Sequence, residues 1–275
     1  MDKPRPFLVA DHQRESAGSG MRGIGDVVGI FDHIAMRTNE GTVEEHPQFR
    51  ECAVHGKYPI SMVDAAGVVR WSAQACPACL AQAEVSRLMA NACVSRRHAG
   101  CTFDNFVTSS ALQREALDTC RNYAERFQEH LASGSSLILS GRPGTGKTHL
   151  ASAIARTLLG QGHSVLMTTA YEMVLRIRKS WNNPNEDEDA VTGTFAKPDL
   201  LILDEVGKQY GSDSELVHIF HVIDRRSRDM RPTLLISNES PEGMIKYVGF
   251  PVFDRLTENG GVLVEFEWGS HRSGG

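Results

Sequence analysis

The chain has no long apolar segment and no segment that resembles a secretory signal. No apolar run approaches the roughly eighteen residues that a membrane-spanning helix requires. In the N-terminal sequence MDKPRPFLVADHQRES only residues 7–10 are continuously apolar, so we expect a cytoplasmic protein with no membrane partner. Hydrophobic residues nevertheless occupy 41% of the 275 positions, which is enough for one large or two ordinary domains.

Positive charge is scarce as well. The chain has 29 Lys and Arg residues against 34 Asp and Glu residues, which gives a net charge of −5. Proteins that coat nucleic acid through bulk charge need an excess of cations to neutralise the phosphates. Any contact with DNA must therefore come from a local basic patch.

Cysteine is also in short supply, but its distribution is informative. Six cysteines are too few for a disulfide scaffold, and four of them lie between positions 52 and 93, which in a reduced compartment indicates metal binding. Cys52-x-x-His55 and Cys76-x-x-Cys79 each have the spacing of a zinc knuckle, and three thiolates with one imidazole form a closed structural Zn²⁺ site. The alternative is a set of reduced, unliganded cysteines. We expect Cys93 to be buried against a helix.

Beyond residue 135, short apolar runs alternate with helical patterns. Alternation of this kind indicates βαβ units and an α/β fold with a parallel sheet. The pattern predicts strands at 136–141, 164–169, 199–206, 232–238 and 262–268, and helices at 147–162, 170–181 and 214–229.

The pattern also predicts three parts of the chain. Residues 1–45 are rich in glycine and predict a flexible arm. Residues 46–100 form a zinc-binding module, in which YPISMVDAAGVVRW predicts two short strands around a glycine turn. Residues 101–275 form the α/β domain.

Three further segments have readable patterns. Ala81 to Arg97 has helical spacing and predicts a helix that links the two halves. Ser110 is placed to cap a helix over residues 111–132. Residues 182–190, NNPNEDEDA, predict a solvated acidic loop. The expected buried face of the 111–132 helix comprises Leu112, Ala116, Leu117, Cys120, Tyr123, Ala124 and Phe127.

The segment GRPGTGKT fits the phosphate-loop pattern G-x-x-x-x-G-K-[ST] between a predicted strand and a predicted helix. Its glycines let backbone N–H groups wrap the phosphates at a helix N-terminus. Lys147 is expected to reach the β- and γ-phosphates of ATP, and the Thr148 hydroxyl to ligate Mg²⁺. The candidate nucleotide-binding residues are Gly141, Pro143, Gly144, Thr145, Gly146, Lys147 and Thr148.

Two later strand ends supply candidate catalytic groups. The run LLILDE predicts a buried strand that delivers Asp204 to the Mg²⁺ shell and Glu205 to the attacking water. Asn238 ends the predicted strand at 232–238, where it would orient the same water. From spacing alone, Arg255 and Arg272 favour surface salt bridges, although the developing charge on a γ-phosphate needs cations.

Four segments together resemble one protein family: SGRPGTGKTHLASAIARTLL, LLILDEVG, VIDRRSRDMRPTLLISN and FEWGSHRS. They are similar to the DnaC-type replicative helicase loaders, relatives of the IstB transposition ATPases within the AAA+ class. The resemblance runs in one collinear order from about Cys101 to Arg272. It implies a five-stranded AAA+ sheet, ATP or ADP bound between neighbouring subunits, and a homo-oligomer.

The resemblance also implies roles for single residues. Asn238 matches the first sensor, Arg255 the arginine finger that acts in trans, and Arg272 the second sensor. The family contacts single-stranded DNA, at positions that match Trp181 and, in the loop after the acidic strand, Ser212.

The residues themselves indicate the same DNA surface. Arg176, Arg178, Lys179 and Trp181 combine cations with a stacking platform, which suits a single strand of any sequence. The alternative is a solvated helix end with a half-buried Trp181. The chain departs from the best-known loaders at its N-terminus, where a zinc module replaces a helical helicase-binding segment.

These observations favour an ATP-dependent loader, with residues 1–100 docking on a replicative hexameric helicase and the ATPase domain holding single-stranded DNA. An IstB-like helper that recruits a transposase to DNA is the main alternative. A nucleotide-binding switch with negligible turnover is a third.

Overall fold

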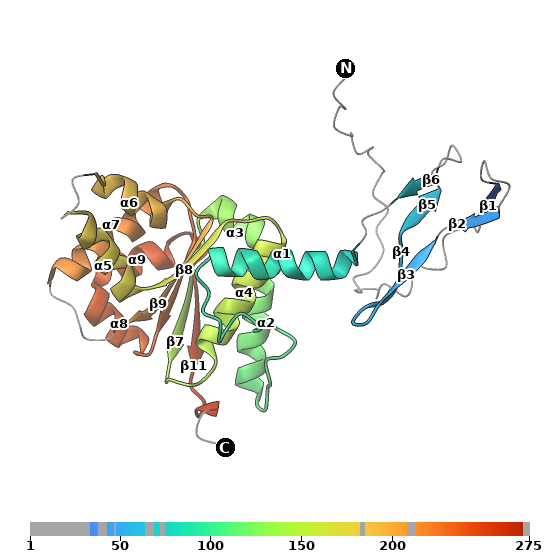
Figure 1. Cartoon of the computed structure of the whole chain (residues 1–275). Coiled ribbons are helices and arrows are strands. Elements are labelled where there is room, and N and C mark those ends of the chain that lie inside the picture. The colour runs from blue at the N-terminus through green and yellow to red at the C-terminus, as the bar shows by residue number, and fades with distance from the viewer. Residues whose placement is uncertain are drawn as a thin grey trace. The chain divides into compact units, whose positions relative to one another are not determined.

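The structure is a computed structural model that describes residues 34–37, 43–46, 48–63, 69–71, 75–181, 185–207 and 213–271. The chain divides into two compact units, Met1–Cys79 and Leu80–Gly275 (Figure 1). In the described ranges, no helix has both the length and the apolar character needed to cross a membrane.

The described residues of the first unit form three antiparallel strand pairs. They pair β1 (Ile34–Arg37) with β2 (Val43–His46), β3 (Phe49–Cys52) with β4 (Gly56–Pro59), and β5 (Ser61–Val63) with β6 (Val69–Trp71). The β5–β6 hairpin confirms the two strands predicted between the metal-ligand pairs. The β1–β2 hairpin falls mostly within the segment expected to be an arm, because strands of four residues are too short to give a detectable alternation.

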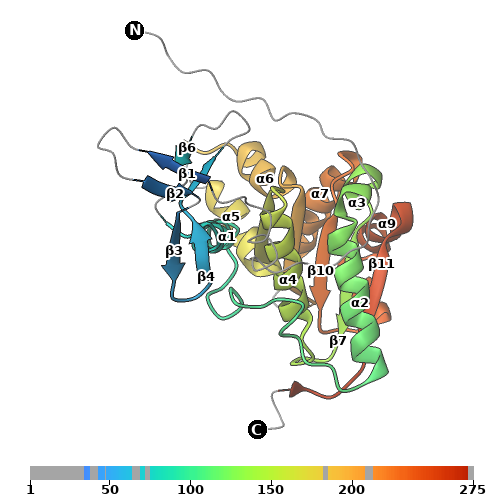
Figure 2. The same ribbon diagram turned by 90° about the vertical axis from the view of Figure 1, so that its right-hand side faces the viewer.

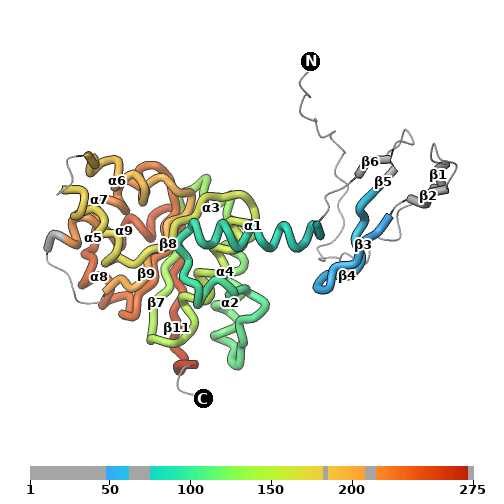
Figure 3. The backbone as a smooth tube through the Cα atoms, viewed as in Figure 1, coloured from blue at the N-terminus to red at the C-terminus, as the bar shows by residue number. Residues whose placement is uncertain are grey.

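The second unit is built on a parallel sheet of five strands, which confirms the predicted fold class. The strand order is β11-β7-β10-β9-β8, so the last strand of the chain lies beside the first strand of this sheet (Figure 3). The five strands are β7 (Leu137–Gly141), β8 (Val165–Thr169), β9 (Leu200–Val206), β10 (Thr233–Ser237) and β11 (Val262–Phe266).

Helices cover both faces of the sheet (Figures 1 and 2). Alternate strand residues explain the two layers: Leu139 and Ile202 belong to one core, and Ile138 and Leu203 to the other. The first core lies under α2 (Ala111–Glu125) and α4 (Lys147–Gly160), with the end of α1 (Pro77–Asn91). The second lies under α5 (Ala170–Ser180), α6 (Glu188–Ala196), α7 (Asp213–Arg228), α8 (Pro241–Val248) and α9 (Phe250–Thr257).

The helix predicted over residues 111–132 is interrupted. Ser110 caps α2 through a reciprocal capping box with Gln113, as expected, but the helix ends at Arg126 and α3 (Phe127–Ser133) follows. Gln113 is buried and Leu112 is exposed, which reverses the predicted polarity of the first turn. Gln113 turns inward because its side-chain oxygen accepts hydrogen bonds from the N–H groups of Ser109 and Ser110.

Two other expectations are wrong. The loop predicted at residues 182–190 already contains the start of a helix, since Asp187 caps α6 and Glu188 and Asp189 form its first turn. Acidic side chains are favourable there because they face the positive end of the helix dipole. Cys93 is exposed rather than buried, because it follows the end of α1 with a left-handed backbone (φ 61°).

A fully buried arginine connects the second core to the sheet. Arg226 on α7 donates from Nε to the Thr233 hydroxyl at 3.1 Å. Burial lowers the pKa of Arg226 to about 9. Its guanidinium also donates to the backbone carbonyls of Phe195, Ala196, Pro198, Asp199 and Pro232.

Candidate functional site

The phosphate loop joins β7 to α4, and close packing explains two of its glycines. A Cβ at Gly141 would lie 2.5 Å from the carbonyl oxygen of Phe266, and one at Gly146 would lie 2.6 Å from the ring of Phe106. Both glycines also have positive φ, 127° and 101°. The glycine pattern is therefore required by the protein's own packing as well as by a phosphate.

Lys147 is buried at the base of this loop. Its Nζ donates to the carbonyls of Gly141 at 2.6 Å and Arg142 at 2.8 Å. The Thr145 hydroxyl donates to the same Arg142 carbonyl at 2.8 Å. These bonds fix the curvature of the loop and leave the ammonium at the site where phosphates would lie.

Thr148 and Asp204 meet at the carboxyl edge of the sheet. The Thr148 hydroxyl donates to Oδ2 of Asp204 at 3.0 Å, and the N–H of Glu205 donates to Oδ1 at 2.6 Å. Burial raises the pKa of Asp204, and these two hydrogen bonds oppose that shift. The hydroxyl and carboxylate are adjacent hard oxygen ligands, the donor set that Mg²⁺ prefers.

Glu205 and Asn238 complete this edge. Glu205 has a positive φ of 60°, which turns its exposed side chain away from the line of β9. Both residues line a cavity of about 490 Å³. A carboxylate and an amide therefore face the space beside the phosphate loop.

Most of the predicted nucleotide-binding residues line this cavity. Gly141 and Thr145 stabilise the conformation of the phosphate loop and are not among the residues that line the cavity. Six lining residues were not predicted: Arg97, His98, Cys101, His149, Ile236 and His271. The first three come from the segment before α2, which has no recognisable motif, and the other three lie on α4, on β10 and after β11 beside residues that were predicted. The predicted residues that do line the cavity are Pro143, Gly144, Gly146, Lys147, Thr148, Asp204, Glu205 and Asn238.

The nucleotide-binding unit matches a known family. Residues 79–249 match the family described as IstB-like ATP binding protein. The replicative helicase loader DnaC of Escherichia coli strain K12 is 38% identical over 176 residues, which cover 64% of this chain and 71% of that protein. The chain belongs to the DnaC-type branch of this AAA+ ATP-binding family. A DnaC loader of Buchnera aphidicola subsp. Acyrthosiphon pisum is 35% identical over 190 residues, covering 69% and 76% of the two chains.

Solved structures show the same fold. The crystal structure of a DnaC helicase loader has a TM-score of 0.56 at 22% identity and covers 62% of this chain and 99% of that one. The crystal structure of DnaI gives 0.54 at 18% identity, covering 62% and 94%. At these identities the likeness establishes the AAA+ architecture of the second unit.

Of the two candidate arginines, the structure describes Arg255. Arg255, in the last turn of α9, contacts Asp224 at 3.3 Å and Glu258 at 3.7 Å and does not line the cavity of its own chain. Arg272 lies outside the described residues. The segment before it binds the phosphate loop: the indole of Trp268 donates to the Thr145 carbonyl and the N–H of His271 to the Gly144 carbonyl, both at 3.0 Å.

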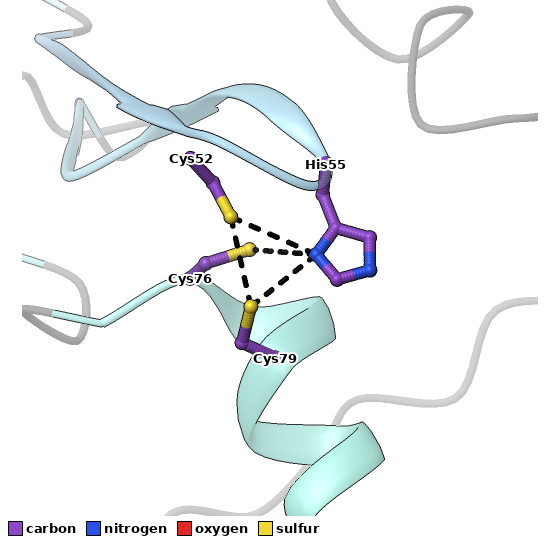
Figure 4. A group of neighbouring side chains, drawn as sticks. All are labelled: Cys52, His55, Cys76 and Cys79. Carbon is purple, nitrogen blue, oxygen red and sulfur yellow. Dashed lines mark hydrogen bonds between the residues drawn. The ribbon is translucent and has the colours of Figure 1, made fainter.

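The four predicted zinc ligands converge in the first unit (Figure 4). Their ligand atoms all lie within 4.8 Å of one another. The Nδ1 atom of His55 is 3.7, 3.7 and 3.3 Å from the sulfurs of Cys52, Cys76 and Cys79, and the Cys52 and Cys79 sulfurs are 3.6 Å apart.

These distances fit a tetrahedral metal. Zn–S bonds of about 2.3 Å and Zn–N bonds of about 2.0 Å place tetrahedral ligands about 3.8 Å (S···S) and about 3.5 Å (S···N) apart. The N–H groups of Val54 and His55 lower the pKa of Cys52 to about 6, while the hydrogen bond to Cys52 raises the pKa of Cys79 to about 11.

The candidate DNA surface lies at the end of α5. Arg176 and Lys179 are exposed, Arg178 is half-buried, and Trp181 is 56% exposed. One side of the Trp181 indole lies against His218, with the ring centroids 5.3 Å apart. Ser212 lies outside the described residues. The structure thus brings four of the five predicted residues to one helix end.

Proposed function

We propose that this protein is an ATP-dependent loader that places a replicative hexameric DNA helicase on single-stranded DNA. The observation that carries the proposal is the 38% identity to a replicative helicase loader over 176 residues, in a chain that has a complete phosphate loop and an acidic strand end. Relatives at 35–38% identity are named as loaders, which favours this function over the transposition helper.

Each group at the nucleotide cavity has a proposed task. Lys147 binds the β- and γ-phosphates, and Thr148 and Asp204 hold Mg²⁺, which neutralises phosphate charge when bound. Glu205 polarises the attacking water and Asn238 orients it. We propose slow hydrolysis to ADP and phosphate, because ATP gates assembly rather than powering movement.

Completion of the site requires a second copy of the chain. Arg255 does not line the cavity of its own chain, which supports action in trans on a neighbour's γ-phosphate. Arg272 is proposed as the second sensor within one chain. Its neighbour His271 binds the Gly144 carbonyl, so Arg272 follows a segment that is attached to the phosphate loop.

The zinc module is proposed as the helicase-docking part. Cys52, His55, Cys76 and Cys79 fit Zn²⁺, which would supply a structural crosslink between the β3–β4 hairpin and the start of α1. Residues 1–100 would bind the helicase. Arg176, Arg178, Lys179, Trp181 and Ser212 would hold the single strand.

A loading assay tests this function. The full-length chain, a replicative hexameric helicase and ATP are combined with single-stranded DNA coated by single-strand-binding protein, and helicase retained on the DNA is measured. We expect ATP-dependent retention, and its loss in Lys147→Ala. Trp181→Ala should weaken binding to an oligonucleotide about five-fold or more with ATP binding intact, because a stacked base is worth about 1–3 kcal/mol. Helicase that is neither captured nor retained would contradict the loader function.

A further inference from the structure

Two side chains of the proposed DNA surface are held by carboxylates of the same chain. The two terminal guanidinium nitrogens of Arg176, Nη1 and Nη2, donate to the carboxylate of Glu186 at 2.6 and 2.9 Å. The indole N–H of Trp181 donates to Glu188 at 2.7 Å. The acidic segment, residues 186–189, therefore contacts both the cation and the stacking residue on which a single strand would depend.

The carboxylates resemble the expected ligand in chemistry. Phosphate and carboxylate both accept two parallel hydrogen bonds from a guanidinium. Glu186 therefore uses the donors of Arg176 that a phosphate would use, and the two anions compete for one site. The hydrogen bonds from the Arg176 guanidinium also lower the pKa of Glu186.

The acidic segment is held in position by the start of α6. The side chain of Asp187 caps the helix by accepting from the N–H of Asp189 at 3.2 Å, and Glu188 lies in the first turn. The contacts themselves are exposed, and an exposed ion pair changes an equilibrium by only about five-fold or less. The start of α6 thus keeps the segment at the surface, and its contacts with Arg176 and Trp181 are weak enough for a strand to displace them.

We propose that residues 186–189 are an intramolecular competitor for single-stranded DNA: Glu186 occupies the donors of Arg176 and must be displaced when a phosphate binds, and Glu188 holds a negative charge at the edge of the Trp181 ring, where it repels the phosphates of a stacked strand. This inference rests on the proposed DNA surface. It assigns residues 186–189 a regulatory role at that surface. A strand that contacts only one subunit binds too weakly to displace the carboxylates, whereas a strand that contacts several subunits at once displaces them.

The same segment provides a matched control. Asp189 pairs with Arg225 of α7 at 2.6 Å, outside the proposed DNA surface. Glu186→Ala, Glu188→Ala and Asp189→Ala each remove one negative charge from the same four residues. Long-range repulsion of DNA therefore changes about equally in all three variants, and only the first two vacate the DNA surface.

The experiment measures binding of a fluorescein-labelled oligothymidine by anisotropy, with saturating ATP and the full-length chain. We expect the single variants Glu186→Ala and Glu188→Ala, each of which removes one charge as Asp189→Ala does, to bind up to about five-fold more tightly than the native chain, and the double variant about three- to ten-fold more tightly. Asp189→Ala should change affinity by less than two-fold. ATP affinity should be unchanged in the double variant, and the melting temperature should fall by no more than about 4 °C, because Glu188 lies in the first turn of α6.

A mutant cycle separates displacement from general charge repulsion. In an Arg176→Ala background, Glu186→Ala should no longer tighten binding, because the side chain for which it competes is gone. In a Trp181→Ala background the same holds for Glu188→Ala.

Two results overturn the inference and leave the DNA surface intact. The first is unchanged or weaker binding by the double variant, which would mean that Glu188 orients Trp181 for stacking. The second is equal tightening by Asp189→Ala. A different result, normal strand binding by both Arg176→Ala and Trp181→Ala, would overturn the DNA surface itself and the inference with it.

Discussion

Replacing Trp268 with phenylalanine tests whether the segment after β11 shapes the phosphate loop. Trp268 is buried, its indole N–H binds the carbonyl of Thr145 at 3.0 Å, and its ring packs on Phe266 with centroids 4.8 Å apart. Phenylalanine keeps much of the ring contact and removes the donor. The Thr145 carbonyl then lies buried without this hydrogen bond.

A buried acceptor that loses its partner costs about 1–3 kcal/mol. For a unit of this size, each kcal/mol corresponds to about 2–4 °C in melting temperature, so we expect a decrease of about 2–12 °C. Because Thr145 belongs to the phosphate loop, part of this cost should appear in nucleotide binding. An ATP affinity about five-fold weaker corresponds to about 1 kcal/mol.

Calorimetry of unfolding and titration with a fluorescent ATP analogue measure the two effects. Phe266→Leu is the matched control, since it disturbs the same packing by about 1 kcal/mol and leaves the indole donor in place. It should lower the melting temperature with little change in ATP affinity. If Trp268→Phe binds ATP as tightly as the native chain, or if both variants lose affinity equally, Trp268 contributes only to packing.

Three other predictions concern the nucleotide cavity, the zinc site and Arg255. Lys147→Ala should abolish tight ATP binding, whereas Glu205→Gln should keep binding and lose turnover, because only activation of the water is removed; normal turnover in Glu205→Gln would exclude it as the base. Elemental analysis should find one Zn²⁺ per chain, and Cys76→Ser, Cys79→Ser should lose the metal and the fold of the hairpins around it, while well under one zinc in native protein prepared without chelator would contradict the site. Mixed Arg255→Ala and Lys147→Ala chains should regain part of the ATPase activity, since each supplies what the other lacks; mixed oligomers without any rescue would leave Arg255 a structural residue.

The sequence predicted the sheet because each of its strands contains a short apolar run. Strands β7, β9 and β10 are buried on both faces, so they appear as runs such as LLIL rather than as an alternating pattern. The motifs at the ends of these strands could also be predicted from the sequence, because glycine, lysine and carboxylates at this fixed spacing are seldom found outside phosphate-binding sites. In the structure, Asp204, Glu205 and Asn238 line the same cavity as residues of the phosphate loop.

Other features depend on contacts that local sequence does not specify. The cavity wall at Arg97, His98 and Cys101 comes from a segment without regular structure, about 45 positions before the phosphate loop, and only the tertiary fold places it there. The start of α6 was missed because Asp and Glu are common in loops, and they are equally favourable in a first helical turn. Composition alone does not separate the two.

For the two adjacent arginines of α7, Arg225 and Arg226, helical spacing could have predicted which one is buried. Ile219, Val222 and Ile223 form an apolar stripe, and Arg226 occupies the next position on it, seven residues after Ile219. Arg225, one position away and therefore about 100° around the helix, pairs with Asp189 instead. A basic residue in register with an apolar stripe is expected to bind backbone carbonyls inside the protein, as Arg226 does. Such a residue cannot contribute to a DNA-binding patch, and the net positive charge available to a strand is smaller than a count of arginines suggests.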